Sequence, residues 1–393
     1  MKRLEVIDGM RGYFLVFMLI NHLVFTGGYW LVEINHRQLA FVEDAQGFVF
    51  LSGLLIGLVY TRKMQKYDFS TGASAIWNRA FELYRYAIGT ILVMLALYFT
   101  LPGAQDYWRD WIGVISFDDP ARWAAMATFL YQPTFMDILP QYIIYMIFAP
   151  FLVWWTLKGQ WAAVLVGSFI VWMAGQLGLH WLATVPLHEA LLREDGEGLR
   201  ASFNLFGWQI VFFSAMVLGV MTASKKIDWS RVFSPDNHII PLGALAICLF
   251  FLPLRILTAH EIMPDFVVEK FWRMEIRRDF GPVYLVNFAA VAAGFAWLLI
   301  AGPKHANATV RKIAGGIEWL FTRRFLMLLG RHSLQVYVWH VFIVYAVKYL
   351  DGFHPDMSQL TKTLIAVSGI ALLALPAIWR EREQLALVPR PAK

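Results

Sequence analysis

The sequence predicts an all-α, polytopic integral membrane protein of about ten transmembrane helices, with both termini in the cytosol. Of its 393 residues, 59% are apolar and only 16% are charged, whereas a soluble globular protein carries about 25% charged residues. Aromatic residues make up 16% of the chain, and Trp and Tyr are enriched where a membrane meets water. Because the polar residues are too few to cover a water-soluble protein, the soluble and disordered classes are excluded.

Ten apolar stretches have the roughly 17–25 residues that a helix needs to cross about 30 Å of hydrocarbon. They cover residues 10–29, 42–61, 80–101, 138–157, 160–182, 203–222, 238–257, 281–302, 324–350 and 361–379. A shorter stretch, 121–131, is expected to lie in the membrane interface. We therefore expect one transmembrane domain over residues 1–393. The first helix is expected to be retained, because no small-residue cleavage site follows it.

The orientation follows from the Lys and Arg residues between these stretches. With the N-terminus inside, the inner segments carry 19 Lys and Arg residues and the outer segments carry nine. Positive charge in short loops stays on the cytosolic side. The net charge of +6 is explained by this asymmetry. It is spread over many short loops, so nucleic acid is not expected as a partner.

Three ionisable residues occur in the first helix, where charge at membrane depth is costly and usually functional. They are Asp8, Arg11 and His22. Arg11 and His22 lie about 20° apart around a helix and about 16 Å apart along it. Arg11 is expected near the cytosolic surface and His22 near the bilayer midplane, with Asp8 one turn from Arg11. Arg binds phosphate and carboxylate, and a neutral His can act as a general base. The alternatives are a snorkelling anchor for Arg11 and a packing role for His22.

Further polar residues mark other helices. Glu43 and Asp44 open the second helix, where they would either orient a hydroxyl-bearing acceptor or be solvated. Gly53 and Gly57 follow and favour close helix packing. Ser333 and His340 share one face of the ninth helix, two turns apart. Ser333, His340 and the polar residues Asn204 and Gln209 of the sixth helix have either an acceptor-side or a packing role. Arg85 follows Arg79 and Glu82, which predicts an ion-pair ladder or a second anion contact.

Several familiar chemistries lack their motifs. The chain has no GxxxxGK[ST] loop, HExxH, GxSxG or CxxC pattern and a single cysteine, Cys248. NTP hydrolysis, zinc chemistry and serine-hydrolase chemistry therefore lose support. Neither a metal nor a tightly bound cofactor is expected.

Five motifs resemble those of the OpgC family, in order and across nearly the whole chain. They are DGMRG followed by NH, then FVFLSG, DILPQY, FNLFGWQ and LGRHSLQVYVWH. That family belongs to a transmembrane acyltransferase superfamily with an Arg-x10-His pattern on the first helix, which Arg11 and His22 match. The resemblance implies a bacterial inner-membrane enzyme that transfers succinyl groups from cytosolic succinyl-CoA to osmoregulated periplasmic glucans.

Roles for single residues then follow as hypotheses. His22 would act as the base or briefly accept the acyl group, with Asn21 or Ser52 stabilising the oxyanion. Arg11, with Asp8, would bind the CoA phosphates, and Arg85 or Arg331 would bind the succinyl carboxylate. A multi-pass transporter of an anionic solute or glycan is the alternative, although the prolines fall mostly at expected helix ends. Membrane lipids are expected partners, and a homo-oligomer stays open.

Overall fold

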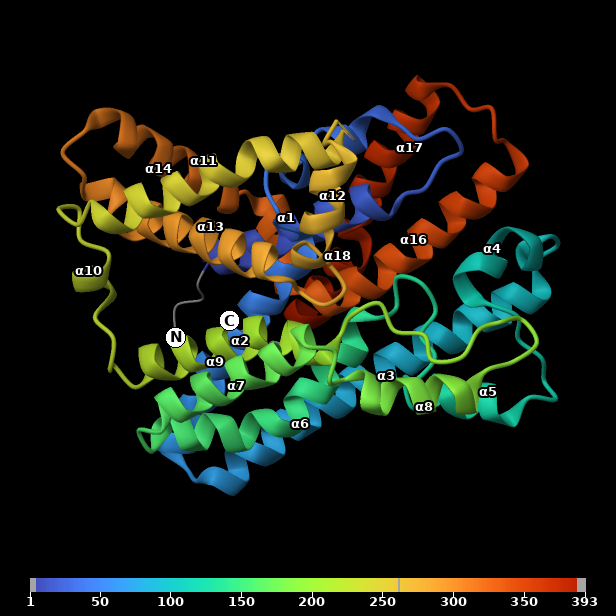
Figure 1. Cartoon of the computed structure of the whole chain (residues 1–393), viewed down its shortest axis with the longest axis horizontal. Helices are drawn as coiled ribbons and strands as arrows, with labels where there is room; N and C mark the ends of the chain where they lie inside the picture. Colours follow the sequence, from blue (N-terminus) through green and yellow to red (C-terminus); the bar gives the residue numbers. More distant parts are fainter. Residues whose placement is uncertain (1–4, 261, 387–393) are drawn as a thin grey trace, which may run out of the picture. The chain divides into compact units, whose positions relative to one another are not determined.

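The computed structural model describes residues 5–260 and 262–386, and these residues are helical with no strand beyond one isolated bridge. The backbone forms two compact units. The first contains residues 1–38 and 301–393, so it combines the two ends of the chain. The second contains residues 39–300. Figure 1 shows the helices in chain order by colour.

The first unit is built around five helices. These are α1 (Glu5–His22), α14 (Ala308–Phe321), α15 (Arg324–Arg331), α16 (Ser333–Phe353) and α17 (Gln359–Leu372), followed by α18 (Ala374–Ala386). Short 3-10 turns cover Trp30–Glu33, His36–Gln38 and Gly302–Lys304. Arg11, His22 and His340, which the sequence singles out as candidate functional residues, therefore lie in the same unit.

The second unit contains the longer apolar helices. These are α2 (Asp44–Lys66), α3 (Phe69–Thr100), α6 (Ile138–Leu157), α7 (Trp161–Gln176), α9 (Leu205–Ala223), α11 (Ile239–Ala259) and α13 (Pro282–Ile300). Shorter helices lie between them: α4 (Ala104–Ile112), α5 (Pro120–Ala127), α8 (Trp181–Leu191), α10 (Trp229–Val232) and α12 (Asp265–Phe271), with a 3-10 turn at Trp272–Met274.

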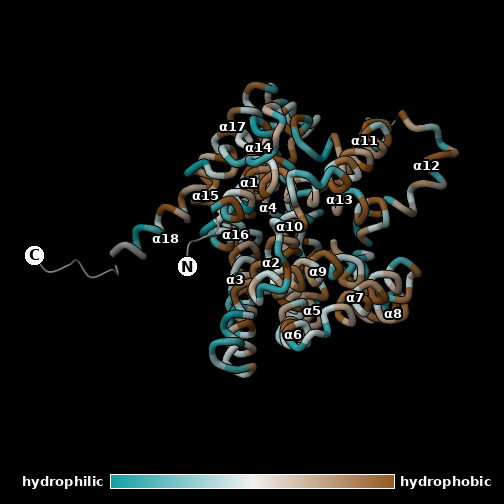
Figure 2. Tube along the Cα trace, turned by 90° about the vertical axis from the view of Figure 1, so that its left-hand side faces the viewer, coloured by the Kyte–Doolittle hydropathy of each residue, from teal (hydrophilic) through white to brown (hydrophobic). Residues whose placement is uncertain are grey.

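The multi-pass membrane prediction is confirmed in kind, and the count of ten is approximate. In the described part of the chain, seven segments are long and apolar enough to cross a membrane: α2, α3, α6, α9, α11, α13 and the joined α17 and α18. An eighth span results if α7 and α8, which are bent by 55°, are counted together. Figure 2 shows hydrophobic colour along α11 and hydrophilic colour toward the end of α18. Helix α1 is not among the seven, since its 18 residues include Glu5, Asp8 and Arg11.

Some predicted bounds are wrong, and each has a local or tertiary reason. The first helix ends at His22 instead of residue 29, and two glycines with positive φ, Gly27 and Gly28, follow it. The stretch 324–350 is two helices that meet at His332. The stretch 160–182 is interrupted after Gln176. Three prolines, Pro150, Pro186 and Pro253, lie inside helices and are exceptions to the expectation that prolines fall mostly at helix ends.

Close packing of α2 on α9 confirms the role predicted for the glycines of the second helix. A methyl group on Gly53 would overlap the carbonyl of Phe212, and one on Gly57 would overlap that of Met216. Gly219 of α9 faces the carbonyl of Leu54 in the same way. Small residues let the two helix backbones approach directly. This contact is the centre of the second unit.

Candidate functional site

The motif glycines of the first unit bring α1 against α15. A methyl group on Gly12 would overlap the backbone of Leu326, and one on Gly330 would overlap the backbone carbonyl of Asp8. Glycine is required at both positions because no side chain fits between the backbones. The DGMRG and LGRHS motifs, which lie more than 300 residues apart in the sequence, are therefore in direct contact.

This packing joins the charged residues that the sequence singled out. Arg11 Nη2 donates a 2.6 Å hydrogen bond to Ser333 Oγ. Arg331 Nε lies 3.9 Å from Asp8 Oδ2, and Arg331 also pairs with Glu381 at 3.3 Å. Asp8 is buried, with 6% of its surface exposed. The cluster around Arg11 and Asp8 thus draws on α1, α15, α16 and α18, and it includes Ser333, which was expected on the acceptor side.

His22, eleven residues after Arg11 on α1, contacts another histidine, His340 of α16. His22 Nδ1 lies 3.1 Å from His340 Nε2, with the ring centroids 5.3 Å apart. His340 is fully buried, and its Nδ1 hydrogen-bonds the carbonyl of Tyr337 one turn earlier in α16. His22 itself is half-buried. Sequence reasoning proposed both histidines without predicting their contact.

The loop after α1 is held by charges that sequence reasoning missed. Asp351 Oδ2 accepts from Thr26 N at 3.0 Å and from Thr26 Oγ1 at 2.9 Å. Lys362 Nζ donates to the carbonyl of Gly28 at 3.1 Å and also to that of Thr26. Asp351 and Lys362 are both buried. A charged residue within or beside an apolar stretch was the available signal.

A second side of the same loop contacts Asn21. Asn35 Nδ2 donates to Asn21 Oδ1 at 2.8 Å, and Tyr13 Oη lies 3.3 Å from His36 Nδ1. The amide oxygen of Asn21 is therefore directed at Asn35. Of the two groups predicted to stabilise an oxyanion, Asn21 belongs to the unit that holds His22, whereas Ser52 belongs to the second unit.

In the second unit, Glu43 and Asp44 are buried, so the alternative that they are solvated is wrong. Glu43 caps α2 in a reciprocal contact with Gln46 and forms an ion pair with Arg277. A carboxylate at a helix N-terminus is stabilised by the unpaired backbone N–H groups there. The cap and the ion pair with Arg277 therefore compensate the buried charge of Glu43.

The other residues predicted in this unit have internal contacts or surface positions. Asn204 caps α9 and donates to Asp279 Oδ1 at 2.9 Å. Gln209 exchanges two hydrogen bonds with Ser168 of α7, each 2.7 Å long. Arg85 is exposed and lies over the ring of Phe81, while Arg79 pairs with Glu82 at 2.6 Å as the ladder predicted. These contacts are those of helix packing and capping.

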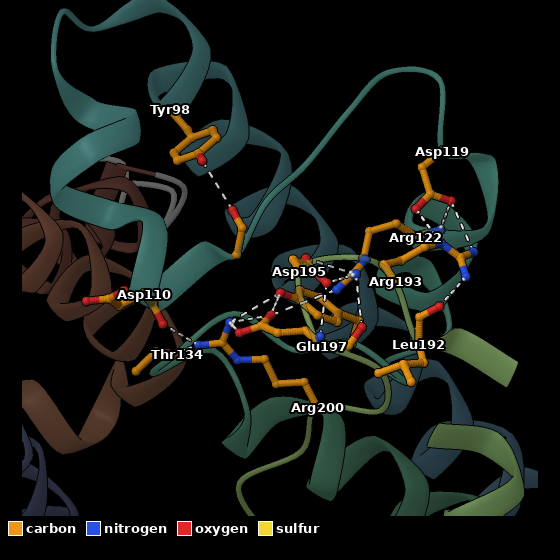
Figure 3. Close-up of polar contacts among 12 residues, drawn as sticks. Tyr98, Asp110, Asp119, Arg122, Thr134, Leu192, Arg193, Asp195, Glu197 and Arg200 are labelled. Carbon is orange, nitrogen blue, oxygen red and sulfur yellow. Dashed lines mark hydrogen bonds and ion pairs between the residues drawn. The ribbon is translucent and has the colours of Figure 1, made fainter. Parts of the chain in front are cut away.

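A separate ionic network joins two connections of the second unit, residues 104–137 and 192–200 (Figure 3). Arg122, only 3% exposed, donates from Nη2 to both carboxylate oxygens of Asp195 at 3.1 Å, and its guanidinium lies 4.2 Å from the Tyr131 ring centroid. Arg200 bridges Glu197 and the carbonyl of Asp110. Burial and the contact with Glu197 raise the pKa of Tyr131 to about 12.

At the rim of this network, Arg193 pairs with Asp119 at 2.8 Å. The hydrogen bond from Arg193 holds the pKa of the Asp119 carboxyl below its usual range. The network consists of oppositely charged residues that contact one another across the two connections, so we interpret it as a structural clamp between these loops.

A family model described as "OpgC protein" matches residues 2–384, essentially the whole chain. No curated protein and no solved structure matches the chain. The matched range covers all of the second unit and most of the first.

Proposed function

Because the chain belongs to the OpgC family, we propose that it transfers a succinyl group from succinyl-CoA to hydroxyls of osmoregulated periplasmic glucans in the bacterial inner membrane. Family membership indicates a membrane acyltransferase that acts on periplasmic glucans. The acyl donor, the acyl group and the membrane are the proposed refinements. The cytosolic position of the donor fits the predicted orientation, in which Arg11 lies toward the inner side.

The observation that carries the proposal is the contact between His22 and His340. His22 lies on α1, the same helix as Arg11. In the proposed reaction, His22 removes the proton of a glucosyl hydroxyl while its oxygen attacks the thioester carbonyl carbon. The C–S bond then breaks, and the CoA thiolate takes the proton back from the His22 imidazolium. Ester and free CoA are the products, and no additional reactant is needed.

In this proposal, Arg11 of α1 binds the donor. Arg11 can offer a planar set of N–H donors to a phosphate, and its 2.6 Å contact with Ser333 orients that set. Arg331 already neighbours Asp8 and Glu381. It would therefore bind the succinyl carboxylate only by exchanging a partner, and Glu381, with 40% of its side chain exposed, is the one that can move away.

The test uses purified protein in lipid nanodiscs with isotope-labelled succinyl-CoA and isolated glucan. We expect esterified glucan from the wild-type chain, and a loss of at least about 10²-fold for His22→Ala, in keeping with removal of a general base. His354, an exposed histidine at the end of α16, is the control, and His354→Ala should leave the rate unchanged. Normal transfer by His22→Ala would remove the base from the proposal.

A transporter is the second candidate function, and two observations favour it. Helices α7 and α8 are bent by 55° at a short break, and Pro150 and Pro253 lie inside α6 and α11. Interrupted helices are typical of transporters. The same assay separates the two functions, because a transporter moves label across a vesicle membrane and produces no glucan ester.

A further inference from the structure

Two histidines from opposite ends of the chain share one hydrogen bond, and the atoms that form it determine which nitrogen of His22 can react. The nitrogens in contact are Nδ1 of His22 and Nε2 of His340, 3.1 Å apart. In a neutral imidazole, one nitrogen carries the proton and the other carries the lone pair. The direction of this bond therefore fixes the tautomer of both rings.

The backbone settles that direction. His340 Nδ1 faces the carbonyl oxygen of Tyr337, and a carbonyl oxygen can only accept, so Nδ1 of His340 carries a proton. The His340 side chain is fully buried, where an imidazolium is costly. The ring is therefore neutral, and its Nε2 is an acceptor. It follows that Nδ1 of His22 is the donor.

We propose that His340 is a positioning residue that holds His22 in the Nδ1–H tautomer, so that Nε2 of His22 carries the lone pair that receives the proton of the acceptor hydroxyl. This inference rests on the proposed function. It adds that His340 sets the tautomer of the base, and that Nε2 of His22 is the atom that accepts the proton. The Tyr337 carbonyl orients His340, and His340 orients His22. When His22 becomes an imidazolium during transfer, its Nδ1–H bond to His340 strengthens, because a charged donor makes the stronger hydrogen bond.

The first test reads the tautomer directly. In protein carrying ¹⁵N-labelled histidine, the two ring nitrogens of His22 have separate shifts that report which one is protonated, and His22→Ala identifies the signals. We expect protonated Nδ1 and unprotonated Nε2 in the wild type near neutral pH. In His340→Phe, which keeps a ring but has no acceptor, we expect the Nε2–H tautomer to gain population. A wild-type protein with His22 protonated at Nε2 overturns the inference, whatever the variants do.

The second test is kinetic. His340→Phe should lower kcat by about 10²-fold, since a wrongly oriented or wrongly protonated base costs a large part of its effect, with little change in KM for either substrate. His340→Gln offers a carbonyl oxygen to the His22 Nδ1–H, so it should be roughly tenfold more active than His340→Phe. His354→Phe, at the exposed end of α16, is the control and should match the wild type.

The outcomes separate this inference from the proposed function. If His22→Ala loses activity while His340→Phe keeps the wild-type kcat, the positioning role is wrong and the base role stands. If His340→Phe and His340→Gln lose activity equally and His22 keeps its tautomer in both, His340 acts only in packing and the inference is overturned. If His22→Ala transfers the acyl group normally, the proposed base itself is wrong.

Discussion

Arg11 Nη2 donates a 2.6 Å hydrogen bond to Ser333 Oγ, across 322 positions of the sequence. The contact exists because Gly12 and Gly330 let α1 approach the backbone of α15 directly. Two short motifs at opposite ends of the chain thereby form one cluster. Because the glycines set the distance between the helices, the charged residues around them depend on that packing.

The first prediction concerns donor binding. Arg11→Ala should raise KM for succinyl-CoA by about tenfold or more, since a charge-assisted hydrogen bond contributes roughly 1.5–3 kcal/mol, and should leave KM for glucan nearly unchanged. Ser333→Ala keeps the cation and removes only its orienting partner, so its effect should have the same direction and be smaller. Steady-state kinetics with each substrate varied in turn measure both. Equal increases in the two KM values would argue against a donor-side role.

The second prediction concerns the close packing of α1. Gly12→Ala should lower the free energy of unfolding by about 1–3 kcal/mol, as overpacking does elsewhere, because the added methyl group meets the Leu326 backbone. Gly315→Ala is the matched control on α14, since nothing lies within 4 Å of its added methyl group. Unfolding in detergent, followed by tryptophan fluorescence, gives both values. A Gly12→Ala protein as stable as Gly315→Ala would show that the helices separate easily.

The third prediction concerns the loop after His22. Asp351→Ala removes the acceptor of the Thr26 N–H and hydroxyl, so it should destabilise the protein by about 1–3 kcal/mol. Thr26→Val removes the hydroxyl alone and should cost less. Hydrogen exchange of the amides of residues 23–29 should speed up in the same order. If exchange in this loop is unchanged in Asp351→Ala, then Asp351 does not hold it.

The fourth prediction concerns the network of Figure 3. Arg122→Met removes a buried cation from Asp195, whose side chain is 12% exposed, and from Glu197; because breaking a fully buried pair costs about 3–5 kcal/mol, we expect a smaller loss of stability here. The segment 192–200 should then be cut faster by a protease added to the protein in nanodiscs. Arg109→Met, at an exposed position of α4, should leave the cleavage rate as it is in the wild type. Equal protection in both variants would contradict a clamp.

The fifth prediction concerns acid. The folded-state pKa of Asp119 is lowered, chiefly by the Arg193 hydrogen bond. Its contribution to stability is therefore present above the unfolded pKa, about 3.9, and is lost as the pH falls through the lower folded value. The difference in stability between wild type and Arg193→Met should be constant near neutral pH and shrink below about pH 4. Unfolding midpoints of both proteins from about pH 3 to 7 measure this difference in stability. A difference that grows as the pH falls would contradict the prediction.

Much of the helical architecture follows from local pattern. Helix α6 begins and ends at the predicted residues 138–157, and α9, α11 and α13 differ from prediction by at most about two residues at either end. An apolar run bounded by polar residues determines a helix without reference to distant parts of the chain. The polar residues Asp8, Arg11, His22, Ser333 and His340 were also recognisable, since ionisable and polar groups are rare inside apolar stretches.

Pairing among these residues depended on the tertiary structure. Which nitrogen of His22 meets His340, 318 positions away, is decided by the packing of two helices, and periodicity within one helix carries no such information. The loop that follows the end of α1 is likewise held by distant residues, because Asp351 binds Thr26 and Lys362 binds Gly28. The sequence by itself determined a multi-pass helical protein with candidate groups on the first and ninth stretches, because apolar length and buried charge are local properties. Only the tertiary structure decided which of those groups touch, because contacts between distant residues depend on how backbones approach each other.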